Sequence, residues 1–230
     1  MEAVVLAGGD AWRMKPHLWI PKPLAEVAEG VTLLEWQVAW LRGHGFRDVY
    51  VCARGFRIEE LDVYWVEERR KLGTGGALRL AAQQLRGDRF YACNCDDILL
   101  DDPRNVVARL EEHPWAAGAL AVAKPRLPWG VVKLEGDRVA RFVEKPLAGE
   151  LSQTLADFYV SVGHYAFDRY RVLPLLPEEG DLEATTLPTL AASGTLCAYA
   201  VRGRWLAVNT YKDLLEARRI LSEVGQPWRV

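Results

Sequence analysis

The sequence lacks the features that mark several large classes of protein. Its 29 lysines and arginines are balanced by 31 aspartates and glutamates, which gives a formal net charge of -2 and no basic surface for nucleic acid or anionic membranes. No apolar stretch approaches the ~20 residues that cross a bilayer, and the acidic Glu2 stands where a secretory signal would be basic. We therefore expect a cytoplasmic protein with no nucleic-acid partner and no membrane partner.

Cysteine and histidine are also scarce, with four of each in 230 residues. A chain of this length can bury a core without disulfides, so the cysteines are expected to be small buried residues on strands. They are Cys52, Cys93, Cys95 and Cys197. Cys93 and Cys95 are too closely spaced for a usual zinc pair, and the histidines are scattered along the chain, so no zinc site is expected.

The best-known phosphate-binding signatures are missing as well. No Gly-Lys-Ser/Thr follows the pair Gly8-Gly9, and no Gly-x-Gly-x-x-Gly surrounds it, so neither a P-loop nor a dinucleotide fold is indicated. The pair directly follows the apolar run 3–7, and Arg13 and Lys22 come after it. Glycines let backbone N–H groups approach a phosphate or a base, although the pair by itself is more often a plain strand-to-helix turn.

Apolar runs and helix signals alternate through the first half of the chain. Thr32 and Glu35 form a capping box that opens a helix, and Gly43 and Gly45 end it. A second helix is expected at 77–85, after a glycine turn at 73–76. The expected strands are 3–7, 49–53, 63–66 and 90–95. This order predicts one α/β domain with a Rossmann-like, mixed but mostly parallel sheet that is flanked by helices.

The second half of the chain has a different pattern. Residues 131–134 and 139–143 flank Gly136-Asp137 and predict a β-hairpin, so a small antiparallel lobe is expected. The other expected elements are a strand at 158–167 and a final helix at 211–222, capped by Thr210 and Asp213.

Taken together, the loop motifs resemble those of one enzyme family. Leu6–Met14 and Pro21–Leu24 resemble the opening motifs of the nucleotidyltransferases that join a sugar 1-phosphate to a nucleoside triphosphate. Asn94–Asp96 follows a buried strand, where open α/β sheets bind ligands, and resembles the metal motif of that family. Further segments resemble its second nucleotide loop, its sugar-phosphate segments and its closing segment: 72–77, then 129–132, 143–146 and 162–165, then 205–213. The resemblance covers nearly the whole chain in the correct order.

The resemblance implies a single domain with three parts. Residues 1–123 would be mainly nucleotide-binding, and residues 124–204, which include the antiparallel lobe, mainly sugar-phosphate-binding. Residues 205–230 would supply the closing metal segment and the C-terminal helix.

The reaction that the resemblance implies needs positive charge rather than a general base. A phosphate oxygen of the sugar 1-phosphate is already an anion when it attacks the α-phosphorus of the NTP, and pyrophosphate leaves. A Ser-His-Asp arrangement is then unnecessary, and none is identifiable in the sequence. Arginine, lysine and Mg²⁺ cancel the negative charge in such reactions, so Mg²⁺ is the expected cofactor.

Carried over position by position, the resemblance also implies a set of site residues. The implied catalytic residues are Arg13 at the triphosphate, Lys22 near the α-phosphate, Asp96 on the metal and Lys145 on the phosphate of the sugar substrate. The implied nucleotide-binding residues are Leu6, Ala7, Gly8, Gly9, Arg13, Gly75 and Asp96. The implied sugar-phosphate-binding residues are Gly130, Glu144, Lys145 and Gly163, and the implied metal ligands are Asp96 and Asn209. Among the neighbouring residues, Asp97 is a candidate second carboxylate, although a capping role is favoured, and His164 and Tyr165 are expected in the core.

Departures from the family motifs leave other functions open. Ala11 and Trp12 replace the glycine and the threonine or serine of the phosphate loop, and Ala11 would be strained if that position needs a positive φ. Cys95 replaces the glycine of the metal motif. The second metal-binding aspartate of the family falls on Ala207, so we expect Asn209 to supply a neutral oxygen instead. These changes would also fit a catalytically idle nucleotide-sugar sensor or regulatory subunit on the same fold.

The choice of substrates is the least determined part of the hypothesis. The loop 73–78 resembles that of mannose and heptose 1-phosphate guanylyltransferases, which favours GTP with mannose 1-phosphate or heptose 1-phosphate. Glucose 1-phosphate with UTP or dTTP comes next, and cytidylyl transfer to a non-sugar phosphate is a further alternative. The sequence leaves open whether the protein forms a homo-oligomer.

Overall fold

The computed structural model describes residues 1–9, 11–125, 127, 129–151 and 157–224. Three stretches of the expected parts lie outside the described residues: Asp10 of the phosphate loop, residues 126, 128 and 152–156 of the sugar-phosphate part 124–204, and residues 225–230 of the part 205–230. Within the described part of the chain, no helix combines the length and the apolar character that a membrane span needs.

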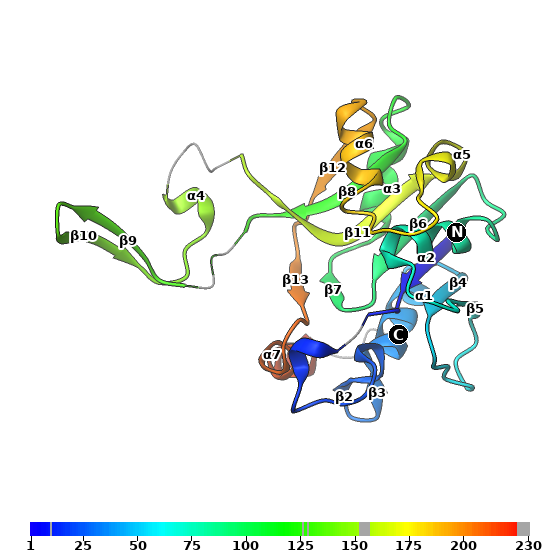
Figure 1. Ribbon diagram of the computed structural model, residues 1–230, viewed down its shortest axis with the longest axis horizontal. Helices are drawn as coiled ribbons and strands as arrows, with labels where there is room; N and C mark the ends of the chain where they lie inside the picture. Colours follow the sequence, from blue (N-terminus) through cyan, green and yellow to red (C-terminus); the bar gives the residue numbers. More distant parts are fainter. Residues whose placement is uncertain (10, 126, 128, 152–156, 225–230) are drawn as a thin grey trace.

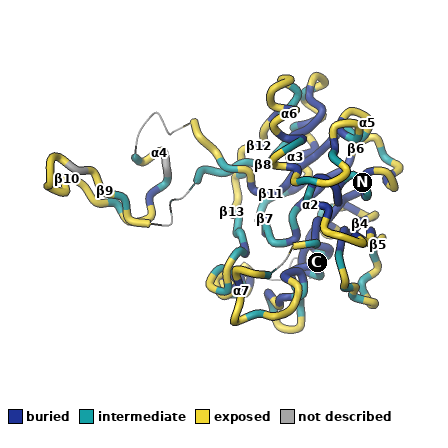
Figure 2. The backbone as a smooth tube through the Cα atoms, viewed as in Figure 1, coloured by how far each residue is buried: buried dark blue, intermediate teal, exposed yellow. Residues whose placement is uncertain are grey.

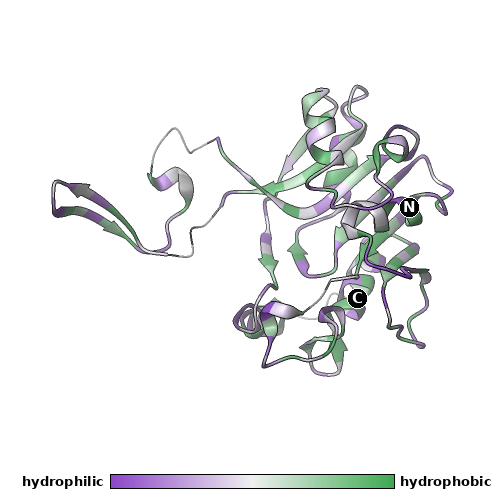
Figure 3. Cartoon of the chain, in the orientation of Figure 1, coloured by the Kyte–Doolittle hydropathy of each residue, from purple (hydrophilic) through white to green (hydrophobic). Residues whose placement is uncertain are grey.

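A seven-stranded sheet forms the centre of the molecule (Figure 1). Its strands, in spatial order, are β12 (Leu196–Ala200), β8 (Gly118–Ala123), β11 (Val160–Asp168), β6 (Arg89–Asn94), β1 (Glu2–Leu6), β4 (Asp48–Ala53) and β5 (Tyr64–Glu67). β11 runs antiparallel to both of its neighbours, and every other neighbouring pair is parallel. The central strands are mostly apolar, as Figure 3 shows, because both of their faces are covered. The structure confirms the predicted mixed, mostly parallel sheet.

Helices cover both faces of this sheet. The buried residues of α1 (Leu33–Gly43), α3 (Arg104–Glu111) and α7 (Tyr211–Val224) join one hydrophobic cluster. Those of α2 (Gly73–Ala82), α5 (Arg169–Val172) and α6 (Thr186–Ala192) join a second cluster on the other face.

Two helix starts follow the predicted capping residues. Thr32 and Glu35 form the capping box of α1, since each side chain accepts a hydrogen bond from the backbone N–H of the other residue. Thr210 and Asp213 cap α7 through the same reciprocal bonds. The predicted caps are therefore confirmed.

The order in which the strands are added to the sheet reverses at β1, and this sets where a ligand can bind. β4 pairs with one edge of β1 and β6 with the other. The carboxyl ends of β1 and β6 therefore flank a crevice of the kind in which open α/β sheets bind ligands. Gly8-Gly9 follow β1 there, and Asn94–Asp97 lie at the end of β6.

The predicted antiparallel lobe is present. β9 (Val131–Glu135) and β10 (Arg138–Val143) form a hairpin. With α4 (Ala148–Leu151) it projects from one end of the sheet in Figure 1, and Figure 2 shows that most of it is exposed.

Some local expectations differ from the structure. The predicted glycine turn at 73–76 is wrong, because these residues form the first turn of α2 itself. Two short antiparallel pairs are not predicted, since such short strands carry too little periodicity. They are β2 (Glu26–Ala28) with β3 (Val31–Thr32), and β7 (Asp97–Leu100) with β13 (Arg204–Ala207). The cysteines are buried and free, and Cys52, Cys93 and Cys197 lie on strands as predicted, whereas Cys95 lies in the turn after β6.

Candidate active site

The loop after β1 carries the glycine pair into the crevice. A Cβ at Gly8 would lie 2.6 Å from Glu68 Oε1, so a larger residue here would displace the Glu68 carboxylate, whereas Gly9 faces open space. Ala11 has a φ of -82°, which is an ordinary value for an L-residue. The alanine that replaces a glycine of the family is therefore unstrained.

Lys22 and Asp96 meet beside this loop. Lys22 begins the 3₁₀ turn η2 (Lys22–Leu24), and its ammonium group donates to Asp96 Oδ2. The two side chains are 11% and 31% exposed, so water screens their attraction less than it screens a surface ion pair. The contact brings together a lysine and a carboxylate that the sequence analysis assigned to one site.

Asp97 points into the protein instead. Its carboxylate accepts hydrogen bonds from Trp205 Nε1 (2.8 Å) and Asn94 Nδ2 (3.1 Å). Burial, followed by the charge of Asp96, raises the pKa of Asp97 to about 7, against the effect of these two hydrogen bonds. Asp97 therefore holds Asn94 and Trp205 in place, which differs from the predicted capping role.

His164 and Tyr165 belong to the core, as predicted, and are 0% and 1% exposed. His164 Nδ1 lies 2.6 Å from the hydroxyl of Tyr91, and its Nε2 lies 2.7 Å from the backbone oxygen of Asp97. Burial lowers the pKa of His164 to about 4, so the ring is neutral at physiological pH.

The closing segment reaches the same place through its backbone. Val208 N–H donates to the backbone oxygen of Asp96 (2.8 Å), which holds the end of β13 beside the Asp96 loop. One residue later, Asn209 Oδ1 accepts a bond of 3.5 Å from Arg13 Nη1. The structure therefore links Arg13, Lys22, Asp96 and Asn209 by a chain of contacts.

The donor set around Asp96 fits the modest demands of Mg²⁺. Within the described residues, no group of three His, Cys, Asp or Glu side chains is placed to hold a metal ion. Mg²⁺ usually takes one or two protein carboxylates and completes its shell with phosphate oxygens and water. Asp96, with its partly exposed carboxylate, and the amide oxygen of Asn209 would be sufficient protein ligands.

A cavity of about 270 Å³ opens between the two glycines and α2. It is lined by Leu6, Gly8, Gly9, Glu68, Lys71, Gly73, Thr74, Ala77, Asn94, Asp96 and Asp181. Of the residues expected to bind the nucleotide, Leu6, Gly8, Gly9 and Asp96 line it. Ala7 lies on the other side of the glycine loop and lines a neighbouring cavity with Trp12 and Lys15.

Gly75 does not line this cavity. A Cβ at Gly75 would lie 2.8 Å from Pro177 Cγ and 2.9 Å from the backbone oxygen of Gly180. Gly75 therefore lets the 177–183 segment pack tightly on α2. Its neighbours Gly73 and Thr74 line the cavity instead, and the Thr74 hydroxyl donates to Glu183 Oε2 (2.7 Å).

The expected sugar-phosphate residues fall into two groups. Gly130, Glu144 and Lys145 lie together at the base of the β9–β10 hairpin, where Lys145 Nζ is 3.9 Å from Glu144 Oε1. Lys145 has a φ of 44°, a conformation that costs energy for a side-chain-bearing residue and that concentrates at functional sites. Gly163 lies apart from them in β11, where a Cβ would lie 2.1 Å from Asp97 Oδ2.

Two carboxylates of the cavity were not among the expected site residues. Glu68 directly follows β5 and is 5% exposed. The signal for it is a polar residue at the carboxyl end of a predicted strand, as for Asn94, although β5 is a partly exposed edge strand and β6 is buried. Asp181 comes from the 177–183 segment, which is distant in sequence, and its Oδ1 would lie 2.7 Å from a Cβ at Gly73. No local pattern indicates that placement.

The sequence matches the family model described as a MobA-like NTP transferase domain over residues 3–176. Among curated proteins, it is 30% identical over 234 residues to the mannose-1-phosphate guanylyltransferase catalytic subunit beta of Danio rerio. It is 29% identical over 236 residues to the mannose-1-phosphate guanyltransferase of Neurospora crassa. These alignments cover 94% of this chain but only 63% and 62% of the relatives, so the chain spans less than two thirds of their length.

Solved structures share the fold. A Bacillus anthracis protein assigned as a glucose-1-phosphate thymidylyltransferase, in complex with sucrose, superposes with a TM-score of 0.74 at 18% identity, over 99% of this chain and 98% of that chain. HddC from Yersinia pseudotuberculosis, complexed with GMP-PN, gives a TM-score of 0.71 at 18% identity, over 95% of this chain and 98% of that chain.

Proposed function

The chain belongs to the family of MobA-like NTP transferase domains, and from this premise we propose that it transfers a nucleotidyl group from an NTP to a sugar 1-phosphate. In this reaction an oxygen of the sugar phosphate forms a bond to the α-phosphorus, and the bond between that phosphorus and the bridging oxygen to the β-phosphate breaks. Pyrophosphate leaves with the electron pair. No proton has to move.

The observation that carries the proposal is the meeting of Lys22 and Asp96 beside the Gly8-Gly9 loop. Lys22 would neutralise charge at the α-phosphate, and Arg13 would hold the β- and γ-phosphates that leave. Such preorganised charges act where negative charge develops. Mg²⁺ held by Asp96 and Asn209 would supply further charge neutralisation. On the hairpin, Lys145 would bind the phosphate of the sugar substrate, and Glu144 would accept bonds from its hydroxyls.

GTP with mannose 1-phosphate is the proposed substrate pair. It is supported by the names of the curated relatives and by the similarity of residues 73–78 to guanylyltransferase loops. Heptose 1-phosphate with GTP comes next, followed by glucose 1-phosphate with UTP or dTTP.

The test is pyrophosphate release with Mg²⁺ across a matrix of NTPs and sugar 1-phosphates, with mannose, heptose, glucose, galactose and N-acetylglucosamine as the sugars. We expect turnover to be highest for GTP with mannose 1-phosphate. Turnover confined to another sugar or base would correct the substrates and keep the reaction. A folded protein that binds nucleotides but releases no pyrophosphate from any pair would contradict the proposal and favour the sensor.

A further inference from the structure

The loop that carries Arg13 contacts the closing segment at two points. Arg13 Nη1 donates to Asn209 Oδ1, and four residues later the ring of His17 stacks on the ring of Tyr211. The two ring centroids are 4.8 Å apart and the ring planes are inclined by 19°, which is within the range in which aromatic rings attract one another. Both contacts join the loop between β1 and η2 to the same short segment at the start of α7.

The contact of Arg13 is too weak to place the loop by itself. Its bond to Asn209 is 3.5 Å long and exposed, and a hydrogen bond of that length contributes little. The backbone N–H groups of Met14 and His17 donate to the carbonyl groups of Ala11 and Met14, so they shape the loop without tying it to another element. The side chain of Met14 is fully buried in the core, which makes it the point about which the exposed part of the loop can turn.

Tyr211, in contrast, belongs to a well-supported part of the chain. It is the first residue of α7, and Asp213 closes the start of that helix by accepting a hydrogen bond of 3.1 Å from the backbone N–H of Asn209. Just before, Val208 N–H donates to the backbone oxygen of Asp96. A ring that stacks on Tyr211 is therefore fixed relative to Asp96.

We propose that His17 is a positioning residue of the transferase: its stack on Tyr211 holds the loop so that Arg13 meets the β- and γ-phosphates of the NTP. The inference rests on the proposed function, since it takes Arg13 as the residue that holds these phosphates. His17 touches no substrate in this role. Its loss would let the loop turn about Met14 and would weaken the binding of the NTP, while the binding of the sugar 1-phosphate would stay the same.

Two other roles for His17 make different predictions. If the imidazole itself bonded to the phosphates, a phenylalanine at this position would be as poor as an alanine, because neither has an N–H group in its side chain. If His17 were only a surface residue, both substitutions would be harmless. A stacking role requires a flat ring, so His17→Phe should keep the function and His17→Ala should lose part of it.

The experiment measures kcat and the KM values of GTP and mannose 1-phosphate, or of the substrate pair with the highest turnover. The proteins are the wild type, His17→Phe, His17→Ala, Tyr211→Leu and the double variant of the last two. His113→Ala is the matched control, because His113 stacks on Trp115 in a similar way, at 5.1 Å and 22°. That pair precedes β8, which runs parallel to β6, and so lies at the opposite edge of the sheet from the crevice.

We expect His17→Ala and Tyr211→Leu each to lower kcat/KM for the NTP by about 2- to 10-fold, the contribution of one aromatic pair, with the KM of the sugar 1-phosphate unchanged. The double variant should be no worse than either single variant, since all three lack the same contact. His17→Phe and His113→Ala should match the wild type. Losses that add up in the double variant, a His17→Phe protein as poor as His17→Ala, or wild-type kinetics of His17→Ala would each overturn the inference.

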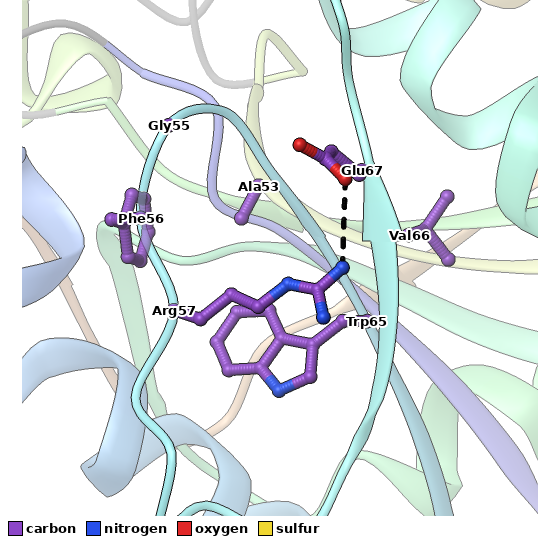
Figure 4. A pocket seen from close by; sticks show the side chains of 7 residues that line it. All are labelled: Ala53, Gly55, Phe56, Arg57, Trp65, Val66 and Glu67. Atoms are coloured by element: carbon purple, nitrogen blue, oxygen red, sulfur yellow. Dashed lines mark ion pairs between the residues drawn. The ribbon is translucent and has the colours of Figure 1, made fainter.

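Tryptic cleavage after Arg13 gives a second readout that needs no substrate. Its rate, followed by mass spectrometry, should rise in His17→Ala and Tyr211→Leu and stay at the wild-type value in His17→Phe, because local opening of the loop exposes the bond. Cleavage after Arg57 in the same digest is the internal reference. The Arg57 side chain is 56% exposed and pairs with Glu67 at 3.6 Å, in the pocket between the loop after β4 and β5 that Figure 4 shows.

The two readouts separate this inference from the proposed function. A wild type that releases no pyrophosphate would contradict the transferase, whereas faster cleavage of His17→Ala after Arg13 would still support the placement of the loop by His17. Unchanged cleavage in both His17→Ala and Tyr211→Leu would overturn the inference whatever the turnover.

Discussion

The ammonium group of Lys22 contacts the carboxylate of Asp96, although 74 residues separate them along the chain. Lys22 comes from the loop after β1 and Asp96 from the loop after β6, and the parallel pairing of these strands brings the two loops to one edge. The same carboxylate is the proposed Mg²⁺ ligand. In the absence of nucleotide, Lys22 therefore reduces the negative charge that would attract the ion.

Lys22→Met tests that relationship in two ways. Turnover should fall by ~10²–10³-fold because a charge at the α-phosphate is lost. The affinity for Mg²⁺ without nucleotide should rise, because Asp96 loses its cationic neighbour. Calorimetric Mg²⁺ titration and pyrophosphate release measure the two effects, with Lys212→Met on the surface of α7 as the control. Unchanged Mg²⁺ affinity and turnover would contradict the role of Lys22.

Arg13→Ala should reduce turnover by ~10²–10³-fold, because the β- and γ-phosphates lose a positive charge. The free energy of unfolding should change little, since the contact of Arg13 with Asn209 is exposed. Steady-state kinetics and urea unfolding measure these effects. Arg219→Ala, on the outer face of α7, removes an exposed arginine and should leave turnover unchanged. An Arg13→Ala rate equal to that of the wild type would refute a role at the triphosphate.

Asp96→Asn should lower activity and Mg²⁺ dependence together, because the amide keeps the shape of the carboxylate and loses its charge. The Mg²⁺ concentration that gives half-maximal velocity is the quantity to measure. Asp62→Asn removes a carboxylate that is 98% exposed and serves as the control. Full activity of Asp96→Asn at the same Mg²⁺ concentration would place the ligand elsewhere.

Substitutions of Asn209 should change the Mg²⁺ requirement in opposite directions. Asn209→Ala should raise the Mg²⁺ concentration for half-maximal velocity, since a neutral oxygen ligand is lost. Asn209→Asp should lower that concentration, because a carboxylate adds charge to the same position. If both variants keep the Mg²⁺ dependence of the wild type, Asn209 is not a ligand and its contact with Arg13 is its whole role.

The raised pKa of Asp97 predicts how stability depends on pH. Its folded-state pKa is about 7 against an ordinary value of 3.8, so between about pH 4 and pH 7 the folded protein binds more protons than the unfolded chain. The free energy of unfolding should therefore fall as pH rises through this window, and Asp97→Asn should flatten that part of the curve. Urea unfolding at several pH values measures it, and parallel curves for the two proteins would show that Asp97 is ionised throughout.

The elements that the sequence predicted correctly depend on residues near one another in the chain. The apolar runs that became β1, β4 and β6 and the capping box of α1 are such local signals. The glycine turn before α2 was predicted wrongly because its helical form depends on a distant segment. Residues 177–180 pack against these glycines, and side chains at Gly75 or Gly76 would collide with them.

Sequence patterns predict the order of strands and helices and the polar residues that end the buried strands. These features follow from the periodicity of apolar residues and from short polar side chains that bond to nearby backbone groups. The tertiary structure sets which strand ends meet, and therefore it places Lys22 against Asp96 and Glu68 against Gly8. It also decided that Asp97 is buried while Asp96 stays partly exposed. Desolvation and charge pairing depend on every element packed around a group, whereas the chain sequence specifies only its neighbours along the chain.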